Sequence, residues 1–236
     1  MAKKVTGEDG KTYKVKKPFY KRVWFWILVV ILVVILGNFL GGGKSDNKNA
    51  SNDNSAKTSE KTSNGSTTKT DSTLKDNFNK ISIGDILSEG DGGSSLEDVK
   101  STFGEPDSTS ETNIEGHSAK MLTWGAPKGG ELMSSLVVSF SNDKAVSKAV
   151  TGLKIAKNDN KASLENFNAI TTDGNYSEDK AKQEFGEPDG ISESLVNGKK
   201  QTMLSWSKNA DGDIGANLNV TFDDGMATSK SQMGLK

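Results

Sequence analysis

The feature that most constrains this chain is an internal repeat with a constant spacing between its two copies. Phe103-Gly-Glu-Pro-Asp107 recurs as Phe185-Gly-Glu-Pro-Asp189, and Met121-Leu-Thr-Trp124 recurs as Met203-Leu-Ser-Trp206. An ungapped alignment of residues 103–154 with 185–236 gives 21 identities in 52 positions. A repeat of this size can fold as a small domain, whereas solenoid units need about three copies for stability.

Each copy begins with the pattern of two short helices. In the second copy Leu164, Phe167 and Ile170 follow the N-cap candidate Ser163 at helical spacing. A second helix is predicted behind Ser95, which forms a capping box with Asp98, and behind the equivalent Ser177. The Phe-Gly-Glu-Pro-Asp motif is typical of the end of that helix, because Gly suits the position after a helix and Pro cannot continue one.

Four strands are predicted after each helix pair. Asn197-Gly198 and Asp224-Gly225 are favoured two-residue hairpin turns. Apolar residues alternate in 136–140 and again in 218–222, which indicates strands with one buried face. The predicted fold class is α+β: two tandem ααββββ repeats, each a helix pair on a four-stranded antiparallel sheet, after one N-terminal transmembrane helix and a disordered linker.

The N-terminal region carries the pattern of a membrane segment. Residues 1–22 contain eight Lys or Arg against two Asp or Glu, and residues 23–43 are all uncharged. A helix of that length spans about 31 Å, close to the thickness of the hydrocarbon core. The positive-inside rule then predicts a single-pass protein in the cell membrane, with a cytoplasmic N-terminus and extracellular C-terminal domains. A cleaved signal peptide is the alternative.

Residues 44–73 contain no aromatic residue and no Leu, Ile, Val or Met, so they are predicted to be a flexible linker. The predicted organisation is therefore a basic cytoplasmic tail (1–22), a transmembrane helix (23–43), the linker (44–73), repeat 1 (74–154) and repeat 2 (155–236).

The chain resembles the β-lactamase-inhibitor-protein-like (BLIP-like) superfamily in four features. They are the helix pair that ends in Phe-Gly-Glu-Pro-Asp, the Trp-bearing strand, the Leu-x-Val-x-Phe strand and the closing Gly-Leu-Lys. Within it, the chain resembles a family of Gram-positive membrane-anchored surface proteins with tandem repeats. The resemblance implies a concave sheet surface that binds protein. The secreted inhibitors have disulfides, and this chain has no cysteine. Inhibition of an enzyme therefore does not follow from the resemblance.

The sequence predicts neither catalysis nor a cofactor nor a metal. His117 is the only histidine, so a triad or a histidine metal site has no partners for it. The Glu and Asp of Phe-Gly-Glu-Pro-Asp flank a proline, where ordinary turn chemistry accounts for them. The segment 209–220 lacks the glycine and the glutamate of a calcium loop. The chain is predicted not to be an enzyme and not to bind nucleic acid.

Two tryptophans are the candidate partner-binding residues. Trp124 and Trp206 lie on the second strand of their repeats, with Leu122 and Leu204 on the same face. They either pack in the core under the helices or lie exposed on the outer sheet face, where tryptophan serves as a binding anchor. Strand alternation places Met121 on the opposite face, but the sequence does not decide which face is exposed.

The predicted function is a membrane-anchored, extracytoplasmic protein-binding module that contacts the lipid bilayer through residues 23–43 and an envelope or extracellular protein through its sheet face. The alternative is a non-enzymatic scaffold or sensor of the cell envelope that contacts wall polymer or lipid.

Overall fold

The computed structural model describes residues 4–6, 12–14, 72–114, 116–156 and 161–236. The chain divides into two units, Met1–Thr68 and Lys69–Lys236. In the first unit, β1 (Lys4–Thr6) pairs antiparallel with β2 (Thr12–Lys14).

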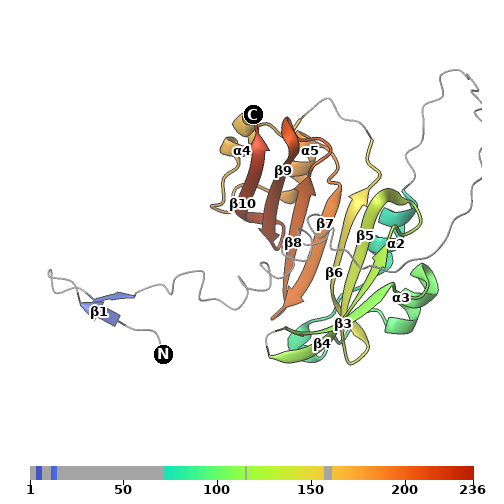
Figure 1. Cartoon of the computed structure of the whole chain (residues 1–236). Coiled ribbons are helices and arrows are strands. Elements are labelled where there is room, and N and C mark those ends of the chain that lie inside the picture. The colour runs from blue at the N-terminus through green and yellow to red at the C-terminus, as the bar shows by residue number, and fades with distance from the viewer. Residues whose placement is uncertain (1–3, 7–11, 15–71, 115, 157–160) are drawn as a thin grey trace, which may run out of the picture. The chain divides into compact units, whose positions relative to one another are not determined.

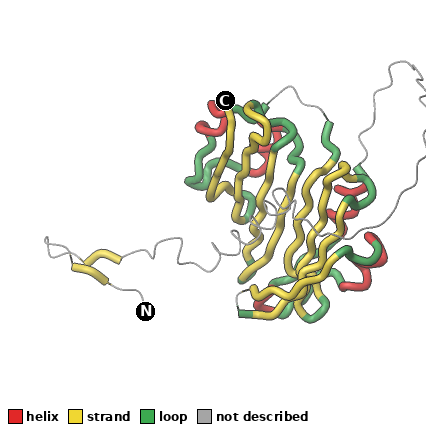
Figure 2. The backbone as a smooth tube through the Cα atoms, in the orientation of Figure 1, coloured by secondary structure: helices red, strands yellow, loops and turns green. Residues whose placement is uncertain are grey.

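The second unit is built on one antiparallel sheet of eight strands in the order β10-β9-β8-β7-β6-β5-β4-β3. Figure 2 shows the strands as one continuous layer. The strands of repeat 1 are β3 (Ser108–Ile114), β4 (His117–Gly125), β5 (Gly130–Ser141) and β6 (Lys144–Leu153). Those of repeat 2 are β7 (Gly190–Val196), β8 (Lys199–Trp206), β9 (Gly212–Asp223) and β10 (Met226–Leu235).

The predicted fold class of two ααββββ repeats, each on its own four-stranded sheet behind a transmembrane helix, is wrong. The last strand of repeat 1, β6, pairs antiparallel with the first strand of repeat 2, β7, in the middle of the sheet (Figure 1). A four-stranded sheet would leave the backbone groups of these two edges without partners, and the pairing satisfies them within one larger sheet. The sequence pattern of one strand does not reveal which strand lies beside it.

The helices are few and short. Repeat 1 has α2 (Thr73–Lys80), the 3₁₀ helix η2 (Ile86–Ser88) and α3 (Leu96–Phe103); repeat 2 has α4 (Leu164–Ala169) and α5 (Glu178–Phe185). The predicted caps are confirmed: the hydroxyl oxygens of Ser95, Ser163 and Ser177 each accept a hydrogen bond from the backbone N–H three residues later.

The structure does not support the predicted membrane localisation. Among the described residues no helix is long and apolar enough to cross a bilayer. The longest helices there have eight residues, about 12 Å at 1.5 Å per residue, against about 30 Å of hydrocarbon. The prediction of a single-pass membrane protein with extracellular C-terminal domains is corrected accordingly. The predicted transmembrane helix (23–43) and nearly all of the linker (44–73) lie outside the described residues, and α2 begins at Thr73.

The hydrophobic core lies between the helices and one face of the sheet. The Phe103 ring of α3 packs on Trp124, and the Phe185 ring of α5 packs on Trp206, with ring centroids 6.1 and 5.4 Å apart. Leu136, Val138 and Phe140 of β5 point to the same side and are buried, as are their counterparts in β9. We call this side the helix face and the opposite side the helix-free face.

The helix pairs of the two repeats differ in their connection. Fifteen residues separate α2 from α3, but eight separate α4 from α5, so repeat 1 has seven more. The longer loop carries η2 and reaches repeat 2, where the Asp85 carboxylate accepts a hydrogen bond from Gly198 N–H at 2.6 Å. Gly198 belongs to the predicted Asn-Gly turn, which has positive φ at both residues. The loop therefore links the two repeats.

Candidate functional site

The structure places all four sequence-predicted binding residues in the core on the helix face. Trp124 is 3% exposed and Trp206 is 0% exposed, and Leu122 and Leu204 are also buried. The strand alternation that turns them inward turns Met121 and Met203 toward the helix-free face. The tryptophans are therefore core residues, and they do not contribute to the helix-free face.

The tryptophans connect each strand to the Phe-Gly-Glu-Pro-Asp motif. The indole N–H of Trp124 donates to the Gly104 carbonyl at 2.9 Å, and that of Trp206 donates to the Gly186 carbonyl at 2.8 Å. The Asp189 carboxylate accepts hydrogen bonds from the backbone N–H groups of Ser207 and Lys208 at 2.7 and 2.6 Å. These contacts give the recurring motifs a structural role.

Two equivalent lysines stabilise the first helix of each repeat. The Lys148 ammonium donates to the carbonyls of Phe78 and Ile81 at 3.0 and 2.7 Å, at the end of α2. The Lys230 ammonium donates to the carbonyls of Phe167 and Ile170, both at 2.8 Å, at the end of α4. A cation there complements the helix dipole and satisfies carbonyls that have no partner within the helix.

Lys148 also forms an ion pair across the seam between the repeats. It lies 3.1 Å from Glu193 on β7, and Glu193 accepts from Lys200 at 2.7 Å. Burial lowers the pKa of the Lys148 ammonium, and Glu193 offsets this only in part. Burial acts to raise the pKa of the Glu193 carboxyl, but the ammonium groups of Lys200 and Lys148 outweigh it and hold that pKa below its ordinary value.

The helix-free face has an uncharged centre. Three adjacent rows of residues cross strands β4 to β8, and none of the fifteen positions holds a charged or aromatic side chain. The rows are Met121, Ser139, Ser147, Ser194 and Gln201; Thr123, Val137, Ala149, Ser192 and Met203; and Gly125, Ser135, Thr151, Gly190 and Ser205. Ser139, Ser192, Gln201 and Met203 of these rows are buried.

The two repeats share their helix face but differ in part on their helix-free face. In β5 and β9 the inward residues of 136–140 recur as the same types, Leu, Val and Phe, in 218–222. On the other side Ser135 and Val137 are replaced by Asn217 and Asn219. The Asn219 carbonyl accepts from the Ser205 hydroxyl at 2.6 Å, and its amide donates to Asn217 at 2.9 Å. Repeat 2 therefore presents ordered amides where repeat 1 presents smaller and apolar side chains.

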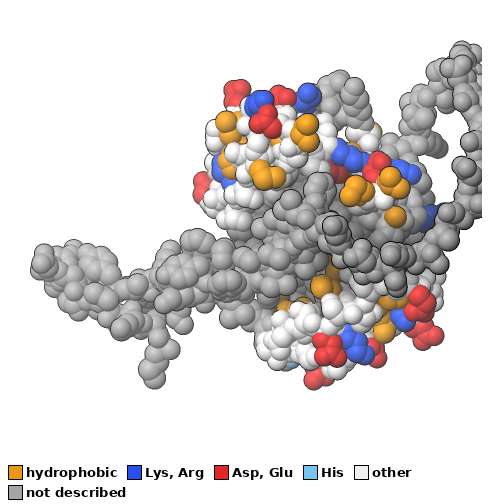
Figure 3. All heavy atoms as spheres, in the orientation of Figure 1, with side chains coloured by type: hydrophobic (Ala, Val, Ile, Leu, Met, Phe, Trp, Pro, Cys, Tyr) orange, Lys and Arg blue, Asp and Glu red, His pale blue; other side chains and the backbone are white. Residues whose placement is uncertain are grey.

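Exposed aliphatic side chains lie at equivalent positions near the start of β5 and β9. Leu132 is 91% exposed, and Ile214, its counterpart in repeat 2, is fully exposed. Leu132 lies where the pairing of β5 with β6 shifts register, between Gly130 and Ser135. Ile214 lies on β9 opposite the register shift of β10 between Met233 and Leu235. Met133 and Met233 are also exposed. Figure 3 shows hydrophobic side chains at the surface of the described domain, some of them beside charged side chains.

Sequence reasoning missed these aliphatic residues. Both fall in polar, glycine-containing segments that have the composition of loops, although the ungapped alignment of the two repeats pairs Leu132 with Ile214. Such segments normally have little reason to retain a large apolar residue at the same position in both copies. That coincidence is the signal that could have found them.

His117 begins β4 and pairs with Ile114 on the edge strand β3. Within the part of the chain that the structure describes, no three His, Cys, Asp or Glu side chains are grouped to hold a metal ion.

Comparison with known proteins agrees with the fold. Residues 70–235 match the family DUF3862, described as a domain of unknown function with a solved structure. A solved structure of a candidate beta-lactamase inhibitor protein from Streptococcus mutans superposes with a TM-score of 0.53 at 22% sequence identity, over 70% of this chain and 97% of that chain. No curated protein matches the sequence.

The fold is thus that of the BLIP-like class, as the sequence resemblance predicted. The chain belongs to the family DUF3862.

Proposed function

We propose that this chain is a protein-binding module that contacts a folded protein through the helix-free face of its sheet and through Leu132 and Ile214, near the starts of β5 and β9, as anchors. The observation that carries the proposal is the pair of exposed aliphatic side chains at equivalent positions of the two repeats. Apolar side chains that a protein leaves exposed become buried when they contact another protein.

The spacing of the anchors favours a macromolecular partner. Strands β5 and β9 run in the same direction with three strands between them, so their first residues lie at one end of the sheet. Four strand spacings of about 4.8 Å place the two anchors about 19 Å apart. That distance exceeds the size of most small ligands and fits within a protein interface of about 800 Å² per partner.

The composition of the face supports recognition by shape and neutral hydrogen bonds. Serine, threonine and asparagine side chains offer adaptable hydrogen bonding, as they do in antibody combining sites. Because repeat 1 and repeat 2 differ at Val137 and Asn219, the two halves meet different chemistry on the partner. The solved relative in fold is described as an inhibitor protein, which also favours a protein as the partner here.

The test is an affinity pull-down with the full chain from an extract of its source cells. The variant Leu132→Ser/Ile214→Ser removes both anchors, and Leu87→Ser removes an exposed leucine on η2, away from both bulged segments. Burial of each anchor contributes about 1.5–3 kcal/mol, so the double variant is expected to lose at least about 100-fold in affinity. The Leu87→Ser chain is expected to retain the same protein as the parent.

Two results contradict the proposal. One is a protein retained equally by the parent and by the double variant while all chains are folded by circular dichroism. The other is no retained protein together with co-sedimentation of the parent with purified wall polymer or lipid vesicles, which moves the function to the non-protein alternative.

A further inference from the structure

The two repeats are joined by an edge-to-edge strand pairing. Strand β6 pairs with β7 over five residue pairs, among them Lys148 with Glu193 and Val150 with Ile191. This seam joins the fourth strand of one repeat to the first strand of the other. Its Lys148–Glu193 ion pair is nearly fully buried at the lysine.

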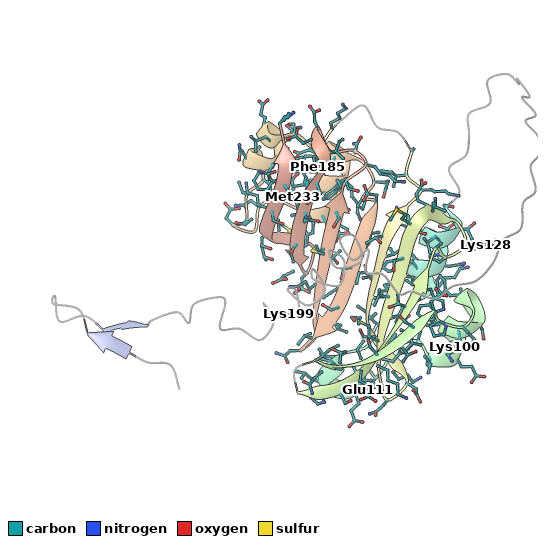
Figure 4. All side chains as sticks on the ribbon, viewed as in Figure 1. Lys100, Glu111, Lys128, Phe185, Lys199 and Met233 are labelled. Atoms are coloured by element: carbon teal, nitrogen blue, oxygen red, sulfur yellow. The ribbon has the colours of Figure 1, made fainter. Side chains whose placement is uncertain are left out.

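The two free edges of the sheet are copies of the two strands in that seam. Strand β3 is the first strand of repeat 1 and corresponds to β7, while β10 is the fourth strand of repeat 2 and corresponds to β6. Figure 4 labels Glu111 on β3 and Met233 on β10, at opposite edges of the sheet. The two outer edges of the sheet are therefore the same two kinds of strand that pair with each other in the seam.

The charges of the seam recur at these edges. In the alignment of the two repeats, Glu111 corresponds to Glu193 and Lys230 corresponds to Lys148. Lys230 reproduces the contacts of Lys148 with its helix, including an ammonium 4.6 Å from the Phe167 ring centre, where Lys148 lies 4.4 Å from Phe78. The ion pairs among the described residues include neither Glu111 nor Lys230. Lys230 donates instead to a third carbonyl, that of Asn168 at 3.2 Å, and Glu111 lies opposite Lys120 on β4.

We propose that the chain associates head to tail with a second copy of itself, β10 of one copy pairing with β3 of the next in the register of the β6–β7 seam. That register places Lys230 opposite Glu111, Ser231 opposite Ser110 and Gln232 opposite Thr109. The contact is heterologous, so association continues beyond a dimer into a linear or closed array.

The irregularities of β10 do not oppose this pairing. Its register shifts with β9 are matched by the shifts of β6 with β5, and β6 pairs with β7 nonetheless. Strand β3 runs in regular register with β4 and contains neither proline nor lysine, so it has none of the features that protect edges. Symmetric β3–β3 or β10–β10 contacts centred on these residues would place Glu111 opposite Glu111 or Lys230 opposite Lys230, which disfavours them.

The contact between copies is weaker than the seam. The buried apolar pair Val150 and Ile191 is replaced by the polar pair Gln232 and Thr109. The seam is further supported by Lys75–Glu187, and Lys75 corresponds to the uncharged Leu164 in repeat 2. Association is therefore expected to be reversible and to weaken as salt is added, because Glu111 is exposed in the free chain.

Cysteine cross-linking of the full chain tests the register directly, because the native chain has no cysteine. A Ser110→Cys chain is mixed with a Ser231→Cys chain under mild oxidation, and cross-linked dimers are counted on a non-reducing gel. Directly opposed residues of an antiparallel pair have Cα atoms about 4.5–5.5 Å apart, within the range of about 4.4–6.8 Å that a disulfide spans. The matched control replaces Ser231→Cys by Gln232→Cys, which points to the other face.

The expected result is a Ser110→Cys/Ser231→Cys dimer that forms several-fold faster than the control dimer. Adding Glu111→Lys to the Ser110→Cys chain should remove that excess, and Glu97→Lys, an exposed charge reversal on α3, should leave it unchanged. Both members of each pair keep residues 1–71, so association through that part is the same throughout. Equal rates in pair and control, a predominance of Ser110→Cys homodimers, or an excess that survives Glu111→Lys would each overturn the proposal.

Discussion

Replacing the equivalent lysine of each repeat separates the contribution of the seam to the free energy of unfolding from the contribution of helix capping. Lys148→Met and Lys230→Met both remove an ammonium from the last carbonyls of a helix. Only Lys148→Met also leaves a largely buried carboxylate, that of Glu193 (16% exposed), with one partner fewer. The two variants are therefore matched in chemistry and differ in the seam.

The magnitudes follow from burial. Loss of hydrogen bonds from a charged donor to partly exposed carbonyls costs about 1–2 kcal/mol at Lys230, because water can replace the donor. Breaking a buried ion pair on one side costs about 3–5 kcal/mol. Because Glu193 keeps Lys200 as a partner, we expect about 3 kcal/mol for Lys148→Met, roughly twice the loss at Lys230.

Urea unfolding of the two variants, monitored by tryptophan fluorescence, measures the difference. A Glu193→Gln background provides the control, since there Lys148→Met should cost about the same as Lys230→Met. Equal destabilisation by Lys148→Met and Lys230→Met in the native background would refute the claim that the ion pair stabilises the seam.

Two further predictions concern stability. Trp206→Ala should destabilise the chain by about 3–5 kcal/mol in urea unfolding, because it empties a fully buried site and removes the hydrogen bond to the Gly186 carbonyl. A loss of stability below about 1 kcal/mol would contradict core packing of the indole. Burial acts to raise the pKa of the Asp85 carboxyl, but backbone N–H groups of Gly198, Leu87 and Asn197 outweigh it and lower that pKa in the folded state. Asp85 therefore adds stability above its unfolded pKa of about 3.9, and this stability is lost as pH falls through the folded pKa. Thermal unfolding between pH 5 and pH 2 should show a smaller loss of stability with falling pH for Asp85→Asn than for the parent. The same dependence of stability on pH in both chains would count against the loop contact.

Helix caps and tight turns were predictable from the sequence, because they depend on residues that are close together along the chain. The caps at Ser95, Ser163 and Ser177 and the turn at Asn197-Gly198 depend on neighbouring residues, and they lie where predicted. The BLIP-like class was also predictable, because the repeat retains its core residues in both copies.

The long-range features were not predictable in the same way. The β6–β7 seam depends on strand neighbours, which alternation does not encode. The face occupied by Trp124 depends on where the helices pack, and alternation is symmetric between the two faces. Lys148 has an ordinary solvated pattern in sequence, yet it is 5% exposed, because its partners come from α2 and β7.

The most direct test of the proposed contact surface is cysteine protection in the complex. Leu132→Cys and Ile214→Cys chains are labelled with a maleimide, alone and after binding the protein retained in the pull-down, with Leu87→Cys as the reference. The account predicts slower labelling at both 132 and 214 on binding and no change at 87. Protection at 87 alone, or none at 132 and 214 in a saturated complex, would place the contact elsewhere and contradict the account.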